Sequence, residues 1–242
     1  MNRRALTVLM LASSWLAAGA CMGAGEVQGQ KPLPMWANGF RFQPGTWGVY
    51  DVQSKGTAET YRVYFAVLEE VAQRKGQAFW IEIEVATTST PAVVTRILTP
   101  VTTNGPGDAM EAIVQVTGYR PFTVPHRYLK PDPKGKGEQV GQFIRFSMPA
   151  NPTFKTIDWR GRNVQAVDVR VTDPQNRPVQ VLISEEAPPL CILRFDGPDA
   201  TMDLLDWGVS AKTKITGKPV GLLRWIMGLF GSALSSAPSE AK

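Results

Sequence analysis

The sequence has little of the side-chain chemistry on which most enzymes and metalloproteins depend. Its 242 residues include one histidine, His126, and two cysteines, Cys21 and Cys191. One histidine and two distant cysteines match no known spacing of a zinc, haem or Cys–His site. The motifs of serine hydrolases, zinc proteases, phosphate-binding loops and dinucleotide-binding folds are also absent. We therefore expect no enzymatic activity, no cofactor and no metal, and a structural role for His126.

The charge pattern excludes a second large class, the nucleic-acid-binding proteins. The formal net charge is +5, but the basic residues are scattered, apart from a small concentration in "KPDPKGKGE" at 130–138. Binding of DNA or RNA needs a basic stripe or face. The mildly basic surface favours anionic lipid headgroups only weakly.

Residues 1–20 have the three parts of a secretory signal peptide. Arg3 and Arg4 give a positive start, residues 5–18 are apolar, and "AGA" at 18–20 places small residues before a cleavage site. The apolar part is too short to cross a bilayer as a helix. We expect the chain to be exported and cut after Ala20.

Cys21 directly follows this expected cleavage site. The stretch "LAAGAC" resembles a bacterial lipobox, although Ala18 stands where leucine is usual. The resemblance implies that Cys21 carries a lipid, and Met22 after it implies an outer-membrane location facing the periplasm. Residues 21–40 are rich in Gly, Gln and Pro and predict a flexible tether. The open alternatives are a plain cut, which gives a soluble periplasmic protein, and a disulfide between Cys21 and Cys191.

The body of the chain, residues 41–218, has the pattern of a mainly β domain. Runs rich in β-branched and aromatic residues alternate with turn sequences that contain Gly, Pro, Asn and Asp. No long helical period separates them, so we expect an antiparallel meander of about nine or ten strands, strongly curved into a half-barrel or barrel. The predicted strands are 46–53, 60–70, 77–86, 92–99, 111–119, 141–148, 162–173, 177–186, 191–197 and 200–208. Segment 92–117 is the least regular, because "DAMEAIVQV" can also open a helix.

The clearest strand is "QAFWIEIEVA" at 77–86, which alternates strictly. One face carries Phe79, Ile81, Ile83 and Val85, and the other carries Trp80, Glu82 and Glu84. The two carboxylates are ~7 Å apart, and paired carboxylates can perform acid–base chemistry. The alternation predicts instead that both lie on a solvated face.

Outside the first twenty residues, "GLLRWIMGLFGSAL" at 221–234 is the most apolar run. Residues 221–235 fit a helix in which Arg224 and small residues form one narrow stripe and apolar side chains cover the rest. About 13 residues at ~1.5 Å each span ~20 Å, less than the ~30 Å core of a bilayer. We expect residues 219–242 to form this helix and a disordered tail. The helix must bury its surface as a lid, as a plug or by docking elsewhere.

Three stretches resemble a known family. They are similar to motifs of bacterial envelope proteins. The first is "GTWGVYDVQ" followed by "AFWIEIEV", the second is "VLISEEAPPLCILRFDG", and the third is "MDLLDWGVSAKTKITG". The position of Cys191 is commonly glycine in those proteins. The stretches, which cover about residues 40–216, resemble the lipoprotein-carrier superfamily typified by LolA and LolB. That resemblance implies an unclosed, strongly bent antiparallel sheet whose apolar concave face can hold acyl chains and is covered by helices. The superfamily usually places its helices early or mid-chain, whereas the apolar helix here is C-terminal.

Two other features have simple structural explanations. Asp196, Asp199 and Asp203 in "DGPDATMD" suggest a calcium loop, but the stretch lacks the EF-hand pattern and is typical of a hairpin turn. Cys191 lies in the apolar run "PLCILRF", which predicts a small buried hydrophobe.

Together these features predict an outer-membrane lipoprotein that faces the periplasm and binds a hydrophobic ligand. The ligand would be a lipid or a lipoprotein acyl chain in the curved sheet, with the C-terminal helix as a lid. The residues expected to line this site or form the lid are Trp47, Trp80, Leu222, Trp225, Ile226, Leu229 and Phe230. The alternative is a non-catalytic scaffold whose helix docks on an envelope protein partner or on the membrane surface.

Overall fold

The structure, a computed structural model, describes residues 43–56, 59–73, 76–88, 90–102, 105–129, 152–172 and 176–227. Within these ranges the chain is mainly β, as the sequence predicts. The strands are β1 (Trp47–Ser54), β2 (Thr60–Gln73), β3 (Gly76–Thr87), β4 (Val93–Thr102), β5 (Gly105–Pro106), β6 (Glu111–Val116), β7 (Phe122–Thr123), β8 (Lys155–Trp159), β9 (Arg162–Thr172), β10 (Pro178–Ile183), β11 (Ile192–Asp196), β12 (Ala200–Gly208) and β13 (Val220–Gly221). A 3-10 helix, η1 (His126–Tyr128), follows β7, and residues 222–227 form a short helical segment.

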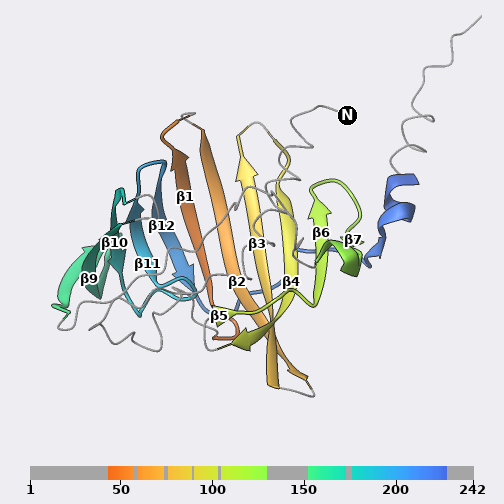
Figure 1. Ribbon diagram of the computed structural model, residues 1–242, viewed down its shortest axis with the longest axis horizontal. Coiled ribbons are helices and arrows are strands. Elements are labelled where there is room, and N and C mark those ends of the chain that lie inside the picture. Colours follow the sequence, from red (N-terminus) through yellow and green to blue (C-terminus); the bar gives the residue numbers. More distant parts are fainter. Residues whose placement is uncertain are drawn as a thin grey trace, which may run out of the picture.

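These strands form one open sheet. The order across it is β13-β7-β6-β4-β3-β2-β1-β12-β11-β10-β9-β8, and β5 pairs with β4 beside this path. All neighbours are antiparallel except β13 and β7. This order is a circular meander that is interrupted between β7 and β8. Strand β1 pairs with β12 in the middle of the sheet, and the strands follow in chain order away from this pair on both sides (Figure 1). The expected antiparallel meander is therefore confirmed, and the sheet is not closed.

The two limbs of the sheet, β2–β7 and β8–β12, share one apolar core. Figure 1 shows β9, β10 and β11 turned away from the plane of β1–β4. Buried side chains from β1–β3 pack together with side chains from β9–β12, although β3 and β9 are not neighbours in the sheet. The fully buried members include Tyr50, Val67, Val181, Ile183 and Leu193. The side of the sheet that carries them is called the first face below.

Strand β3 alternates as the sequence predicts. Phe79 and Ile81 belong to the core on the first face, whereas Trp80 packs against a second cluster on the opposite, second face. Glu82 also lies on the second face, where its cross-strand neighbour on β4 is Arg96. Residues two apart on a strand lie on the same side of the sheet, so Trp80 and Glu82 are neighbours on the second face.

After β12 the chain crosses the second face as an extended stretch, residues 209–216, called the crossing segment. The Ala211 N–H donates to the Gly45 carbonyl oxygen at 2.8 Å, just before β1. Farther along, the Thr216 N–H donates to Gln115 Oε1 on β6, also at 2.8 Å. The crossing segment thus runs from β1 to β6, and the chain after it reaches the edge of the sheet at β7.

A third cluster lies on the first face at the β7 edge. Its buried members are Val93, Val114 and Phe122. Strand β13 pairs in parallel with β7 beside this cluster, with Val220 opposite Phe122. The sheet therefore extends past residue 218, into the stretch that the sequence assigned to the helix.

A few expected elements differ from the structure or lie beyond it. Residues 111–116 of "DAMEAIVQV" form strand β6, so the helical alternative for this stretch is wrong. Strand β8 is not predicted by the sequence pattern, because it has five residues and two of its side chains are charged. The following expectations lie outside the described residues: the signal peptide at 1–20, the tether at 21–40, the strand at 141–148 and the chain beyond residue 227.

Candidate docking site at the β7 edge

Trp225 holds the helical segment, residues 222–227, on the β7 edge of the sheet. Its Nε1 donates to the Arg120 carbonyl oxygen at 2.8 Å. Its ring centroid lies 4.6 Å from that of Phe122. Leu222, three residues earlier, packs against the same apolar cluster. Residues three apart share a side of a helix, so one side of the segment is fixed to the sheet.

The other side of the helical segment faces solvent. Leu223 is 80% exposed and Met227 is 72% exposed. They are four residues apart and form one stripe along the helix. Arg224 beside them is exposed, and Ile226 is half-buried. Leu223 and Met227 are not among the predicted site residues, because a segment that is apolar nearly all round gives no sign of which side packs.

Trp47 and Trp80, the other predicted ligand-site residues, lie on the second face. Trp47 stacks on Tyr64 with ring centroids 6.2 Å apart, and its Nε1 donates to the Val209 carbonyl oxygen at 3.0 Å. The Arg96 guanidinium lies 4.5 Å from the centroid of the Trp80 ring. Both indoles are engaged in packing against the crossing segment or a neighbouring strand.

The predicted ligand-site residues therefore do not share one surface. Leu222 and Trp225 pack on the first face at the β7 edge, whereas Trp47 and Trp80 lie on the second face. The remaining predicted residues, Cys21, Leu229 and Phe230, lie outside the described residues.

Glu82 has a different environment from the one that the strand pattern predicts. Its side chain is 0% exposed, so the expectation of a solvated position is wrong. Thr213 Oγ1 donates to Glu82 Oε2 at 2.5 Å, and the Lys214 N–H donates to Glu82 Oε1 at 2.7 Å. Burial raises the pKa of Glu82, although these two hydrogen bonds and the nearby Arg96 and Lys214 charges oppose the rise. The carboxylate fastens the crossing segment to β3.

The neighbouring groups extend this contact. The Lys214 ammonium pairs with Glu84, and it lies 4.0 Å from the centroid of the Tyr64 ring. Burial, reinforced by the Glu82 and Glu84 charges, raises the pKa of Tyr64 to about 12. Glu82, Glu84 and Lys214 all contact another part of the same chain, so this cluster explains the packing of the crossing segment.

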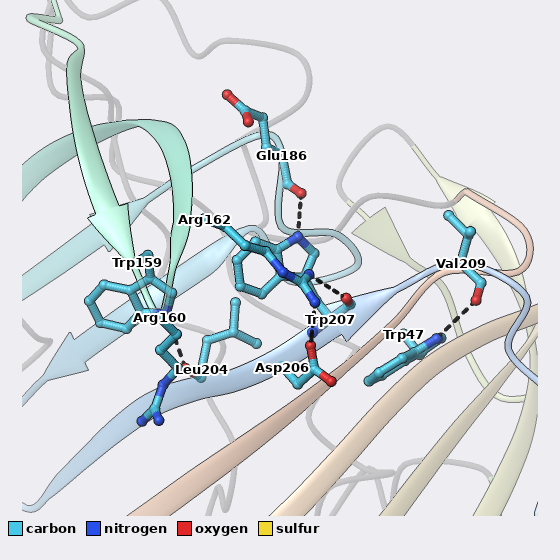
Figure 2. A network of polar contacts seen from close by, with 9 residues as sticks. All are labelled: Trp47, Trp159, Arg160, Arg162, Glu186, Leu204, Asp206, Trp207 and Val209. Carbon is cyan, nitrogen blue, oxygen red and sulfur yellow. Dashed lines mark hydrogen bonds and ion pairs between the residues drawn. The ribbon is translucent and has the colours of Figure 1, made fainter.

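The β8–β9 hairpin is tied to β12 by side chains that donate to backbone carbonyl groups (Figure 2). Trp159 Nε1 and Arg160 Nε both donate to the Leu204 carbonyl oxygen, at 3.1 Å and 2.9 Å. Arg162 Nη1 donates to the Trp207 carbonyl oxygen at 2.8 Å. Because β8 and β12 stand four places apart in the sheet, these bonds close the bend of the second limb.

Trp207 links this contact to the loop after β10. Its Nε1 donates to the Glu186 carbonyl oxygen at 2.7 Å, and the Arg162 guanidinium lies 4.2 Å from its ring centroid (Figure 2). Arg162 also pairs with Asp206 at 2.8 Å. The Asp206 carboxylate also accepts a hydrogen bond from the Trp207 N–H at 2.9 Å, so the groups of this arrangement bind one another and hold the second limb together.

The structure also places the histidine, cysteine and aspartate residues considered in the sequence. His126 begins η1 and is exposed. Cys191 is buried, as expected, with φ +58°. Asp196, Asp199 and Asp203 each pair with a different cation, which are Lys55, Arg177 and Arg194. Among the residues described, no group of three His, Cys, Asp or Glu side chains is arranged to hold a metal ion.

The comparisons with known proteins leave the chain without an assigned family. No protein-family model matches it, and no curated protein matches its sequence. In the part of the chain with described structure, no helix has the length and hydropathy needed to cross a bilayer.

Proposed function

We propose that this protein is a non-catalytic interaction protein of the cell envelope, in which a packed β-sheet body presents its C-terminal helix for docking. One observation carries the proposal. Leu222 and Trp225 fix the helical segment to the sheet, while Leu223 and Met227 on its other side remain exposed. Exposed apolar side chains on a fixed support are typical of contact surfaces.

The packed core favours a scaffold over a cavity that holds an acyl chain. The main cluster joins both limbs of the sheet, and its largest members are wholly buried. A bound acyl chain would have to displace such side chains, at a cost of roughly 25 cal/mol for each Å² of apolar surface uncovered.

We also propose that the sheet is related to the bent half-barrels of the lipoprotein-carrier superfamily. The circular meander interrupted between β7 and β8 supports it. So does Cys191, because φ +58° is a conformation that glycine adopts most readily and glycine is common at this position in the envelope proteins that the sequence resembles. The helical segment at an edge, away from the main core, favours a docking role over a carrier role.

Attachment through a lipid on Cys21, at the periplasmic side of the outer membrane, completes the proposal. The signal-like residues 1–20 and the lipobox-like stretch support it. Fatty-acid labelling of the chain in cells tests this part, and a Cys21→Ser variant should take up no label.

In-cell photo-crosslinking tests the docking role. A photo-reactive amino acid replaces Leu223 in one strain and Met227 in another. The matched control replaces Val209, which is 69% exposed and lies in the crossing segment. We expect adducts, with a protein or with lipid, from positions 223 and 227 and none from position 209. Folded protein that gives no adduct at 223 and 227, or the same adducts at all three positions, would contradict the docking role.

A further inference from the structure

Acidic residues are missing from two stretches of the chain, whose described parts, residues 112–129 and 207–227, meet at the β7 edge. Residues 112–131 and 207–239 contain no Asp or Glu. They hold seven of the 26 Lys and Arg and none of the 21 Asp and Glu, so the rest of the chain has 19 basic and 21 acidic residues. The basic residues are scattered along the chain, but its net positive charge comes from these two stretches.

The fold brings the two stretches side by side. Strand β13 pairs with β7, Trp225 bonds to the Arg120 carbonyl group, and Figure 1 places the helical segment beside η1 and β7. Four exposed cations result from this arrangement, which are Arg120, Arg127, Lys218 and Arg224. Within the described residues, no carboxylate forms an ion pair with any of them.

Aromatic and aliphatic side chains lie among these cations. Tyr119 and Tyr128 are exposed, as are Leu223 and Met227. The Arg127 guanidinium lies 4.8 Å from the centroid of the Tyr128 ring. Aromatic rings, aliphatic side chains and basic groups without acids are the composition of segments that lie in the headgroup region of a bilayer.

We infer that the β7 edge binds the surface of an anionic lipid bilayer. The inference rests on the proposed docking function and names its partner. Leu223 and Met227 enter the boundary between headgroups and acyl chains, and the four cations contact lipid phosphate groups. Glu111 at the start of β6 lies beside this edge. The stretches that form the edge itself carry no acids, which suits a surface of uniform negative charge better than a protein surface of mixed charge.

Vesicle sedimentation tests this inference with the exported chain carrying Cys21→Ser, so that no lipid anchor contributes. The probes are vesicles of phosphatidylglycerol with phosphatidylethanolamine and vesicles of phosphatidylcholine alone. We expect binding to the anionic vesicles that weakens as salt is added, and little binding to phosphatidylcholine. Equal binding to both kinds of vesicle, or to neither, would overturn the inference.

Paired variants locate the binding surface. Arg120→Gln with Arg224→Gln should weaken binding to anionic vesicles about 25-fold, at about 5-fold for each charge removed. Lys155→Gln with Arg170→Gln removes the same charge from β8 and β9 at the far end of the sheet, and should have little effect. Leu223→Ser with Met227→Ser should weaken binding by about 10-fold or more. Equal effects of the two charge pairs would show that net charge alone attracts the protein, which overturns the inference.

The two proposals can fail separately. Constant adducts from position 223 with a protein, in a chain that binds no vesicle, would overturn the lipid inference and keep the docking role. Absence of both adducts and vesicle binding would overturn both. Circular dichroism of each variant confirms that the sheet is intact before the comparison is made.

Discussion

The Glu82 carboxylate is wholly buried, yet both of its oxygens accept hydrogen bonds from the crossing segment. Burial disfavours its ionised form and raises its pKa, while Thr213, Lys214 and Arg96 stabilise the charge. The raised pKa means that the folded state binds the proton more tightly than the unfolded chain does. Glu82 therefore contributes a pH dependence to stability.

We predict that this contribution is largest in acid and is lost as the pH rises. The free energy of unfolding of the wild type, relative to Glu82→Gln, should fall as the pH rises from the ordinary glutamate value of 4.5 through the raised pKa. Urea unfolding of both proteins at a series of pH values measures the difference. Since other titrating groups are shared, a difference that is constant or that grows with pH would contradict the prediction.

At the scale of single elements, Trp225 makes most of the contacts that hold the helical segment, and Leu222 packs against the same cluster. Trp225 supplies the hydrogen bond to the Arg120 carbonyl group and the ring contact with Phe122. The segment has only six described helical residues, and so short a helix has little stability of its own in water. Its position must come from these contacts.

We predict that Trp225→Ala releases the segment without unfolding the sheet. Loss of the hydrogen bond and the packing should lower the free energy of local opening by about 2 kcal/mol. Trypsin cleavage after Arg224 should then be about 30-fold faster, while the midpoint of global urea unfolding stays nearly unchanged. Leu223→Ala is the matched control, since its side chain is 80% exposed. A Trp225→Ala protein cleaved no faster than this control would show that other contacts hold the segment.

Sequence patterns located the long strands because each has its own alternation. Strands β1, β2, β3, β4, β6 and β9 to β12 fall on predicted runs. The two-residue strands β7 and β13 are too short to have a period, and they exist because the crossing segment brings Val220 beside Phe122. The burial of Glu82 has no signal in β3, because its cover comes from Thr213 and Lys214. Long-range contacts of this kind decide the candidate site, so only Leu222, Trp225 and Ile226 of the described site were anticipated.

At the scale of the whole molecule, hydrogen bonds between strands that are not neighbours hold the bend of the second limb. Arg162 donates to the Trp207 carbonyl group, pairs with Asp206 and stacks over the Trp207 ring. Its guanidinium is half exposed, so the ion pair itself adds little. The hydrogen bond to the carbonyl group and the ring contact supply most of its effect.

We predict that Arg162→Ala lowers the global free energy of unfolding by about 1 to 2 kcal/mol. Arg62→Ala is the control, because Arg62 pairs with Asp51 across neighbouring strands and is well exposed. Its cost should stay below about 0.5 kcal/mol. Urea unfolding followed by tryptophan fluorescence and by circular dichroism measures both variants. Equal costs for the two would mean that the contact between β9 and β12 carries no special weight.

The pairing of β1 with β12 also affects the order in which parts of the chain can fold. Trp47 lies opposite Gly208 and Ser54 opposite Ala200, so the middle of the sheet joins the first long strand to the last. A growing chain can form the β2–β3 hairpin early, but contacts between such distant residues close late and slowly. Until β12 has been synthesised, the apolar side chains of β1 to β3 have no second limb to cover them. The arrival of the last long strand, β12, therefore sets the earliest moment at which the two limbs can pack together.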